Sequence, residues 1–80
     1  MIIHAIKAPF YQRVTEGSLC SACMASTLET HRYYRDDDYA IPLGSSSHCT
    51  RCHHRRSEDA SGKPVTSLIL DGEPMKIFTD

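Results

Sequence analysis

The sequence predicts a small α+β domain with a thin hydrophobic core. Three observations lead to this fold class: a length of 80 residues, β-branched runs near both ends, and helix signals together with two Cys-x-x-Cys motifs between them. A chain this short buries only about 60% of the surface that it exposes when unfolded. Such domains commonly need a metal ion, disulfides or a partner chain for stability. We expect residues 1–80 to form a single domain.

The four cysteines form two pairs with the spacing of a zinc site. Cys20 and Cys23 make one motif, Cys49 and Cys52 make the other, and 25 residues separate the two motifs. Zn²⁺ binds four thiolates tetrahedrally, and each motif supplies two. The sequence therefore predicts one structural Zn²⁺, whose binding free energy contributes directly to folding.

Other chemistries remain open for the same cysteines. Two disulfides, a redox-active Cys-x-x-Cys pair, and an iron or iron–sulfur site are the alternatives. A histidine could also replace one cysteine as a ligand. His53, which follows the last cysteine, could instead donate to a ligand sulfur.

The composition bears on location and partners. The first seven residues lack the basic opening of a secretory signal, and no apolar run approaches the roughly 20 residues that span a bilayer. Nine Lys and Arg stand against ten Asp and Glu, so the net charge is −1 and no overall positive field attracts nucleic acid. We expect a cytoplasmic protein with no membrane partner.

Strands are predicted at both ends of the chain. Residues 2–8 are apolar and β-branched, and Pro9 ends the run. Residues 65–70 predict another strand, Asp71-Gly72 a hairpin turn, and residues 75–79 the return strand, whose start Pro74 keeps at a sheet edge. We expect the strand at 2–8 and the hairpin at 65–79 to form one small antiparallel sheet. The open edge of this sheet also allows a homodimer.

Residues 17–62 form the predicted zinc module. Residues 51–60 predict a helix that Thr50 caps and that Gly62 and Pro64 end. Residues 44–47 predict a flexible approach to the second motif. A treble-clef finger has this order: a first Cys-x-x-Cys knuckle, a connecting segment, and a second knuckle at the N-terminus of a helix. A zinc ribbon, with both knuckles on hairpins and no such helix, is the alternative.

Residues 27–40 have two interpretations. Ser26-Thr27-Leu28-Glu29 fits a capping box that would open a helix through about Arg35. A hairpin near the zinc would instead carry Tyr33, Tyr34 and Tyr39. Asp36-Asp37-Asp38 then forms a solvated turn, which could also mimic phosphate towards a basic partner.

The cysteine motifs and their neighbours resemble zinc-stapled HNH endonucleases of phages and bacteria. The resemblance covers Leu19-Cys20-Ser21-Ala22-Cys23 and the run from His48 to Arg56, about half of the chain. It implies a structural zinc and a second metal, held by histidines, that cleaves DNA. His53 matches the histidine after the last cysteine, and His31 matches the general base of the central strand. The asparagine of that family has no counterpart, because the chain contains no asparagine.

These observations predict a non-catalytic zinc-finger protein that binds a macromolecule, of phage or prophage type by its resemblance. We expect the partner to be a protein rather than nucleic acid, because the net charge is negative and the acidic run repels phosphate. The alternative is a shortened HNH nuclease that uses His31 and His53. The expected partner-binding residues lie on the predicted helix and among the tyrosines: Arg51, Arg55, Arg56, Tyr33 and Tyr34.

Overall fold

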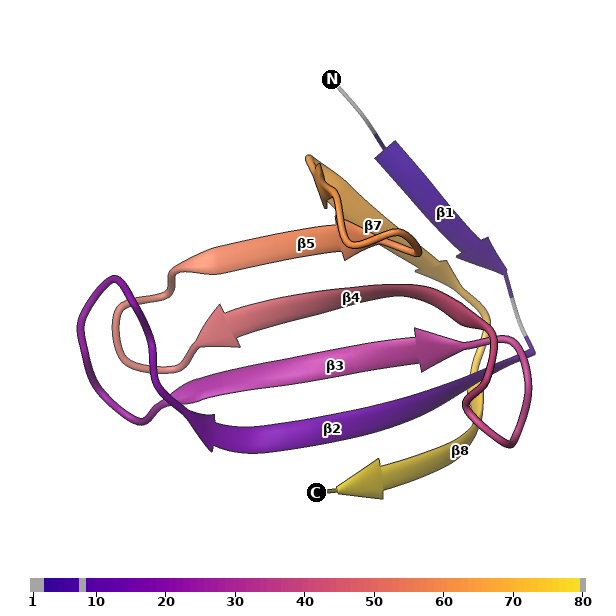
Figure 1. Ribbon diagram of the computed structural model, residues 1–80, viewed down its shortest axis with the longest axis horizontal. Coiled ribbons are helices and arrows are strands. Elements are labelled where there is room, and N and C mark those ends of the chain that lie inside the picture. Colours follow the sequence, from indigo (N-terminus) through magenta and orange to yellow (C-terminus); the bar gives the residue numbers. More distant parts are fainter. Residues whose placement is uncertain (1–2, 8, 80) are drawn as a thin grey trace.

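The computed structural model describes residues 3–7 and 9–79, with side chains for 9–79. Eight strands are present (Figure 1): β1 (Ile3–Lys7), β2 (Phe10–Ser18), β3 (Leu28–Tyr34), β4 (Pro42–Cys49), β5 (Arg55–Asp59), β6 (Pro64–Val65), β7 (Ser67–Asp71) and β8 (Pro74–Thr79). Across the described residues there is no helix, and hence none that is long and apolar enough to cross a membrane.

Six of the strands form one mixed sheet in the order β6-β5-β4-β3-β2-β8. The strands from β2 to β6 follow one another as an antiparallel meander, and β8 joins the far side of β2 as a parallel edge strand. Two hairpin loops, at residues 19–27 and 50–54, therefore lie side by side at the same end of the sheet (Figure 1).

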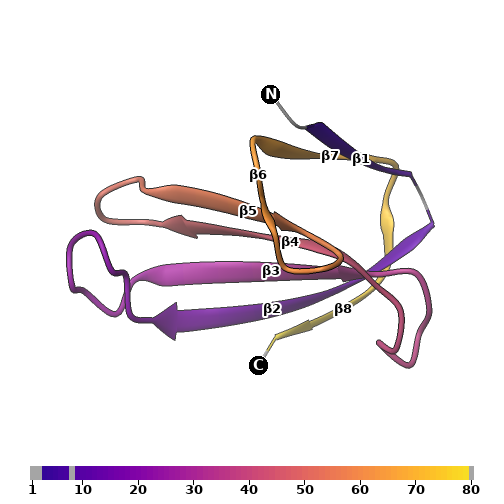
Figure 2. The same cartoon turned by 45° about the horizontal axis from the view of Figure 1, so that its top comes forward.

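The remaining strands, β1 and β7, form a parallel two-stranded ribbon that packs over one face of this sheet. Figure 2 shows the ribbon as a separate layer above β4 and β5. The core lies between the layers. Phe10 and Tyr33 are buried with their rings edge to face at 5.9 Å, and Leu43 and Leu68 pack against them. A register shift after Tyr33 makes a bulge in β4 and brings Leu43 into this core.

The register places alternate side chains on two faces of the large sheet. We call the face towards β7 the inner face and the opposite one the outer face. The inner face carries Phe10, Gln12, Val14, Glu29, His31, Tyr33, Ser46, His48, Arg55 and Ser57. The outer face carries Tyr11, Arg13, Thr15, Thr30, Arg32, Tyr34, Ser45, Ser47, Arg56, Glu58, Lys76 and Phe78.

The α+β fold class and the treble-clef helix are wrong. Residues 55–59 of the predicted helix form β5, which pairs with β4, and residues 28–34 form β3 rather than a helix capped by Ser26. The hairpin alternative for residues 27–40 is confirmed, since β3 and β4 are antiparallel neighbours. Residues 44–47 lie within β4 and are not a flexible linker. Cross-strand pairing thus overrides local helix signals that were only a few residues long.

The predicted terminal sheet is only partly right. Residues 3–7 do pair with residues 67–71, but the pair is parallel, and residues 2 and 8 of the expected strand lie outside the described residues. Asp71-Gly72 does not form a hairpin, because β7 pairs with β1 while β8 pairs with β2. Pro74 has no backbone N–H that could donate to a neighbouring strand. It stands at the start of β8, which is an edge strand of the large sheet.

We expect Gly44→Ala to destabilise the fold by about 2–4 kcal/mol. Gly44 has a φ of 147°, and an added Cβ would lie 2.8 Å from the Glu58 carbonyl oxygen and 3.2 Å from the Leu68 side chain. The control is Gly62→Ala, which has a φ of 87° but meets nothing within 4 Å, and should cost only about 1 kcal/mol. Chemical denaturation of both variants measures the difference. Equal losses would contradict the tight packing of β7 on β4.

Candidate metal centre

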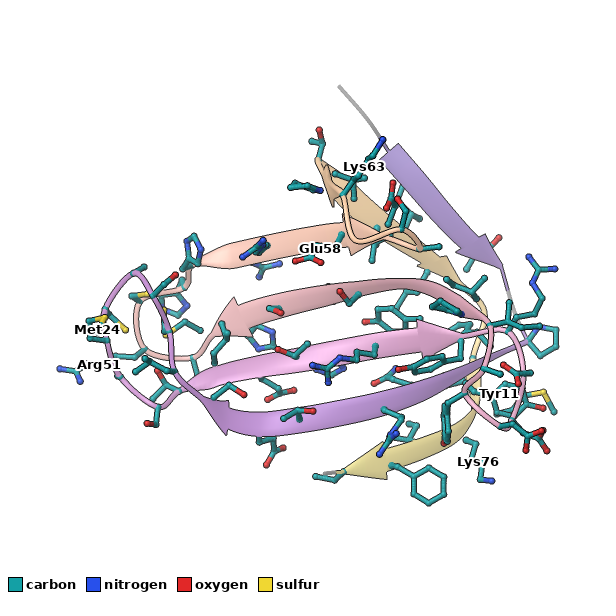
Figure 3. The ribbon with its side chains drawn as sticks, viewed as in Figure 1. Tyr11, Met24, Arg51, Glu58, Lys63 and Lys76 are labelled. Atoms are coloured by element: carbon teal, nitrogen blue, oxygen red, sulfur yellow. The ribbon has the colours of Figure 1, made fainter. Side chains whose placement is uncertain are left out.

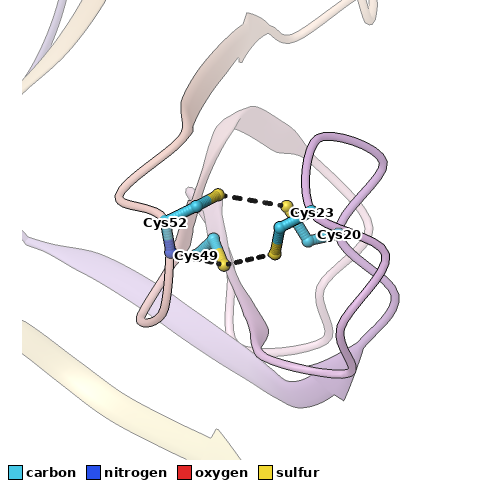
Figure 4. A group of neighbouring side chains, drawn as sticks. All are labelled: Cys20, Cys23, Cys49 and Cys52. Carbon is cyan, nitrogen blue, oxygen red and sulfur yellow. Dashed lines mark hydrogen bonds between the residues drawn. The ribbon is translucent and has the colours of Figure 1, made fainter.

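The two hairpin loops bring all four cysteines together at the end of the sheet (Figure 4). The four Sγ atoms lie within 4.8 Å of one another. The Sγ atoms of Cys20 and Cys52 are 3.7 Å apart, and those of Cys23 and Cys49 are 3.6 Å apart. Each short contact joins one loop to the other. The cysteines are free thiols, since a disulfide would need about 2.05 Å.

These distances fit a single tetrahedral ion. Metal–sulfur bonds of about 2.3 Å place the sulfurs of such a site about 3.8 Å apart. Cys20 and Cys49 are completely buried, and Cys23 is half-buried. The four cysteines are therefore a candidate metal centre with four ligands from two motifs. It is the only such group of His, Cys, Asp and Glu side chains among the described residues, and no histidine belongs to it.

The two loops share one backbone design. In the first, the Met24 N–H donates to the Cys20 carbonyl at 2.7 Å, and the Cys20 N–H donates to the Ala25 carbonyl. In the second, the His53 N–H donates to the Cys49 carbonyl at 3.0 Å. The Cys49 N–H correspondingly donates to the carbonyl of His54. Met24 and His53, each directly after the second cysteine of its motif, have left-handed φ angles of 61° and 62°.

Thr27 links the two loops at the sulfur of Cys49. Its hydroxyl lies 3.0 Å from the Cys49 Sγ, and its carbonyl accepts from the Thr50 N–H at 3.1 Å. The backbone N–H groups of Cys52 and Arg51 also point at this sulfur, from 3.3 and 3.4 Å. Donors of this kind favour a thiolate over a thiol. They lower the pKa of Cys49 to about 5, with the Cys52 N–H as the largest cause and the Thr27 hydroxyl next.

The thiol of Cys52 resists ionisation, in contrast to that of Cys49. The His54 N–H lowers the pKa of Cys52, but desolvation and the three neighbouring thiols outweigh it and raise the pKa to about 12. Four thiolates this close repel one another, so they cannot all ionise alone. A bound cation removes this barrier, because a metal deprotonates the thiols that coordinate it.

The predicted partner-binding arginines do not share one surface. Arg51 is exposed at the tip of the second loop, as Figure 3 shows, with Met24 at the tip of the first. Arg55 and Arg56 lie on opposite faces of β5, since a strand alternates where the predicted helix would not. Arg56 faces outwards and forms an ion pair with Glu58 at 3.1 Å.

The two tyrosines also separate. Tyr33 is only 4% exposed and its hydroxyl lies 3.1 Å from the Ser46 hydroxyl, so it belongs to the core. Burial raises its pKa, which the Ser46 hydroxyl only partly offsets. Tyr34 faces outwards and packs against Tyr39, with ring centroids 5.0 Å apart.

His31 and His53 occupy different settings. His31 lies in β3. Its Nδ1 is 2.7 Å from the Gln12 side-chain oxygen, and its Nε2 forms a hydrogen bond with the Glu29 carboxylate. Its ring stacks on Tyr33 and His48. The side chain of His53 is exposed. The left-handed backbone conformation of this residue shapes the second loop. The groups at the Cys49 sulfur are the Thr27 hydroxyl and the N–H groups of Arg51 and Cys52, and the backbone N–H of His54 acts on Cys52.

Comparison with protein-family models, curated proteins and solved structures finds no match. The likeness to HNH endonucleases is therefore supported only in its four cysteines.

Sequence reasoning missed two residues of the centre. Thr27 was assigned to a helix capping box, and no spacing rule identifies a hydroxyl donor four residues after a cysteine. Met24 was not considered at all. The repeat of the two motifs is a signal for it, since the residue after each second cysteine takes the same turn.

We expect Met24→Gly to stabilise the protein by about 0.5–1 kcal/mol. Glycine adopts a left-handed φ without strain, although its greater freedom in the unfolded chain offsets part of the gain. Met24 is 69% exposed, so its side chain contributes little packing. Chemical denaturation measures the change, with Met24→Ala as the control that keeps the strain. A Met24→Gly variant no more stable than Met24→Ala would argue against the left-handed turn.

We expect Thr27→Val to weaken metal binding about tenfold while the fold persists. The substitution keeps the shape of the side chain and removes the hydroxyl beside the Cys49 sulfur. Thr30→Val is the matched control, because the Thr30 hydroxyl contacts Ser47 and no cysteine. Competition with a chromophoric chelator measures affinity. If both variants bind metal equally well, Thr27 does not support the ligand.

Proposed function

We propose that this chain is a small Zn²⁺-stapled β-sheet module that binds a macromolecular partner and does not itself catalyse a reaction. The observation that carries the proposal is the four-cysteine cluster, which ties the tips of the β2–β3 and β4–β5 hairpins together. An ion held there would fix the four central strands relative to one another. A rigid sheet face is then available for a partner to contact.

Zn²⁺ is the ion that best suits this site. Soft thiolate ligands select Zn²⁺, Cu(I) or iron over hard cations, and four thiolates at tetrahedral spacing are a typical structural zinc set. Both knuckles lie in hairpin loops, which supports a zinc-ribbon-like arrangement over a treble clef. Free thiolates persist in reducing compartments, so we place the protein in the cytoplasm.

The setting of His31 favours binding over catalysis. A general base needs an unshared electron pair that faces the substrate. Both ring nitrogens of His31 are instead engaged with oxygen atoms, of Gln12 and of Glu29. The outer face has no comparable internal network of histidines, and among the described strands β1 and β7 pack only on the inner side. We therefore take the outer face as the contact surface, with Arg56 and Tyr34 as predicted residues on it.

We expect the purified protein to contain one Zn²⁺ per chain and to lose the β2–β5 hairpins when a chelator removes it. Metal binding and folding are coupled in small Cys₄ domains, so Cys49→Ser should have the same effect. Native mass spectrometry measures the metal and circular dichroism the unfolding. Because the outer face carries Arg13, Arg32 and Arg56, we expect an anionic partner. At low ionic strength, the zinc-loaded protein should bind polyglutamate or mixed-sequence RNA, and the metal-free protein neither.

Three results would contradict this function. A folded, metal-free protein with two disulfides, or an iron-loaded one, would remove the zinc staple. A folded zinc protein that binds neither polyanion would argue against a module for anionic macromolecules. Metal-dependent cutting of plasmid DNA that disappears in His31→Ala would establish the HNH-type nuclease instead.

A further inference from the structure

The outer face of the large sheet concentrates positive charge that the whole chain does not have. Its paired positions carry four cations and one carboxylate, Glu58, whereas the net charge of the chain is −1. The carboxylate forms an ion pair with Arg56, one of the four. The cations are Arg13, Arg32, Arg56 and Lys76. Folding therefore separates the charges, and the net charge gives no measure of this surface.

Two of these cations are direct neighbours. Arg13 and Arg32 are paired across β2 and β3 on the same face. The two guanidinium groups extend in different directions from this pair, that of Arg13 over the Tyr39 ring and that of Arg32 towards Thr15. Arg32 is exposed and donates from Nη1 to the Thr15 hydroxyl at 2.9 Å, which orients its guanidinium over the face.

Aromatic rings lie beside the arginines. Tyr39, from the loop after β3, packs edge to face against Tyr34 at 5.0 Å and against Phe78 at 5.6 Å. The guanidinium of Arg13 lies 5.2 Å from the centre of the Tyr39 ring. Phe78 is 44% exposed, and the ammonium group of Lys76 lies 5.0 Å from its ring centre. Figure 3 shows Lys76 and Tyr11 at this end of the sheet, opposite the cysteine loops.

Hydroxyl groups continue the face towards the cysteine loops. Thr15, Thr30 and Ser47 are successive neighbours across β2, β3 and β4, and Arg56 follows on β5. The Thr30 and Ser47 hydroxyls are 3.0 Å apart. Hydroxyl and arginine donors are the groups that contact phosphate oxygens in protein–nucleic acid complexes.

We propose that the outer face binds single-stranded nucleic acid, with phosphates along Arg13, Arg32 and Arg56 and a base stacked on Phe78. This inference rests on the proposed function and names its partner. Aromatic rings beside cations are the features with which proteins hold single strands without sequence preference. From β8 to β5 the face spans about 19 Å, at roughly 4.8 Å between strands, which is enough for a few nucleotides.

Two other polyanions fit this surface less well. A duplex keeps its bases paired and stacked, so the rings of the outer face would have no base face to contact. An acidic polypeptide could neutralise the arginines but has no aromatic base for Phe78. The acidic residues Asp36–Asp38 follow Tyr34 in the loop beyond β3. The phosphates should therefore lie over Arg32 and Arg56, and only the base stacked on Phe78 should reach the side of the face next to this loop.

Fluorescence anisotropy of a labelled oligothymidine of about 15 nucleotides tests the proposal on the full-length, zinc-loaded protein. Oligothymidine has no stable secondary structure, so it reports single-strand binding alone. We expect binding at low salt, weaker binding to a duplex of the same length, and a linear fall of log affinity with log salt concentration. Each phosphate contact contributes about 0.7 to that slope for a single strand.

The chain offers two matched pairs of variants. Arg56 and Arg55 are adjacent but face opposite sides of β5, and Phe78 and Ile77 do the same on β8. We expect the double variant Arg32→Gln/Arg56→Gln to reduce the salt slope by about 1.4, and Arg55→Gln to leave it unchanged. Phe78→Leu should lower affinity at least about fivefold, while Ile77→Leu leaves affinity unchanged. Zinc content and circular dichroism verify that each variant is folded.

Several outcomes would overturn the inference. If Arg55→Gln reduced the salt slope as much as Arg32→Gln/Arg56→Gln does, the outer face would not be the binding surface. Tighter binding of the duplex would exclude the single-strand mode. If the protein bound polyglutamate but not oligothymidine, the proposed function would stand and the partner would be an acidic protein. A folded protein that binds neither polyanion would contradict both proposals.

Discussion

The contact among four sulfur atoms holds the two central hairpins of this protein together at their tips. Cys20 and Cys23 belong to the loop between β2 and β3, and Cys49 and Cys52 to the loop between β4 and β5. The buried aromatic pair lies towards the other end of these strands, where only Phe10 and Tyr33 form the centre of the core. A sheet with so small a core at one end depends on a second anchor at the other.

The anchor also explains the backbone around it. Three described non-glycine residues, Met24, Tyr39 and His53, take left-handed conformations that cost free energy, and two of them, Met24 and His53, directly follow the second cysteine of a motif. The N–H groups released by these turns point at the Cys49 sulfur or close the loops. Strain and hydrogen bonds thus act together to bring the four sulfurs within 4.8 Å of one another, and the same contacts lower the pKa of Cys49 and raise that of Cys52.

The sheet that the anchor stabilises has two chemically different faces. The inner one carries the core and a polar network around His31, and the β1–β7 ribbon packs on it. The outer one presents arginines, hydroxyl groups and aromatic rings. Because successive residues of a strand point in opposite directions, neighbours such as Arg55 and Arg56 serve different faces. The outer face is where we place the partner.

The sequence by itself determined the four candidate metal ligands, because the spacing of Cys-x-x-Cys is a local property that survives any choice of fold. It also offered the hairpin of residues 27–40 as one of two interpretations, and it predicted a pairing between the two ends of the chain but not its parallel direction. Only the tertiary structure decided that residues 55–59 form a strand, since that strand exists through its ladder with β4. The same holds for Thr27 beside Cys49 and for Arg13 opposite Arg32, contacts between residues distant in the chain that no local pattern encodes.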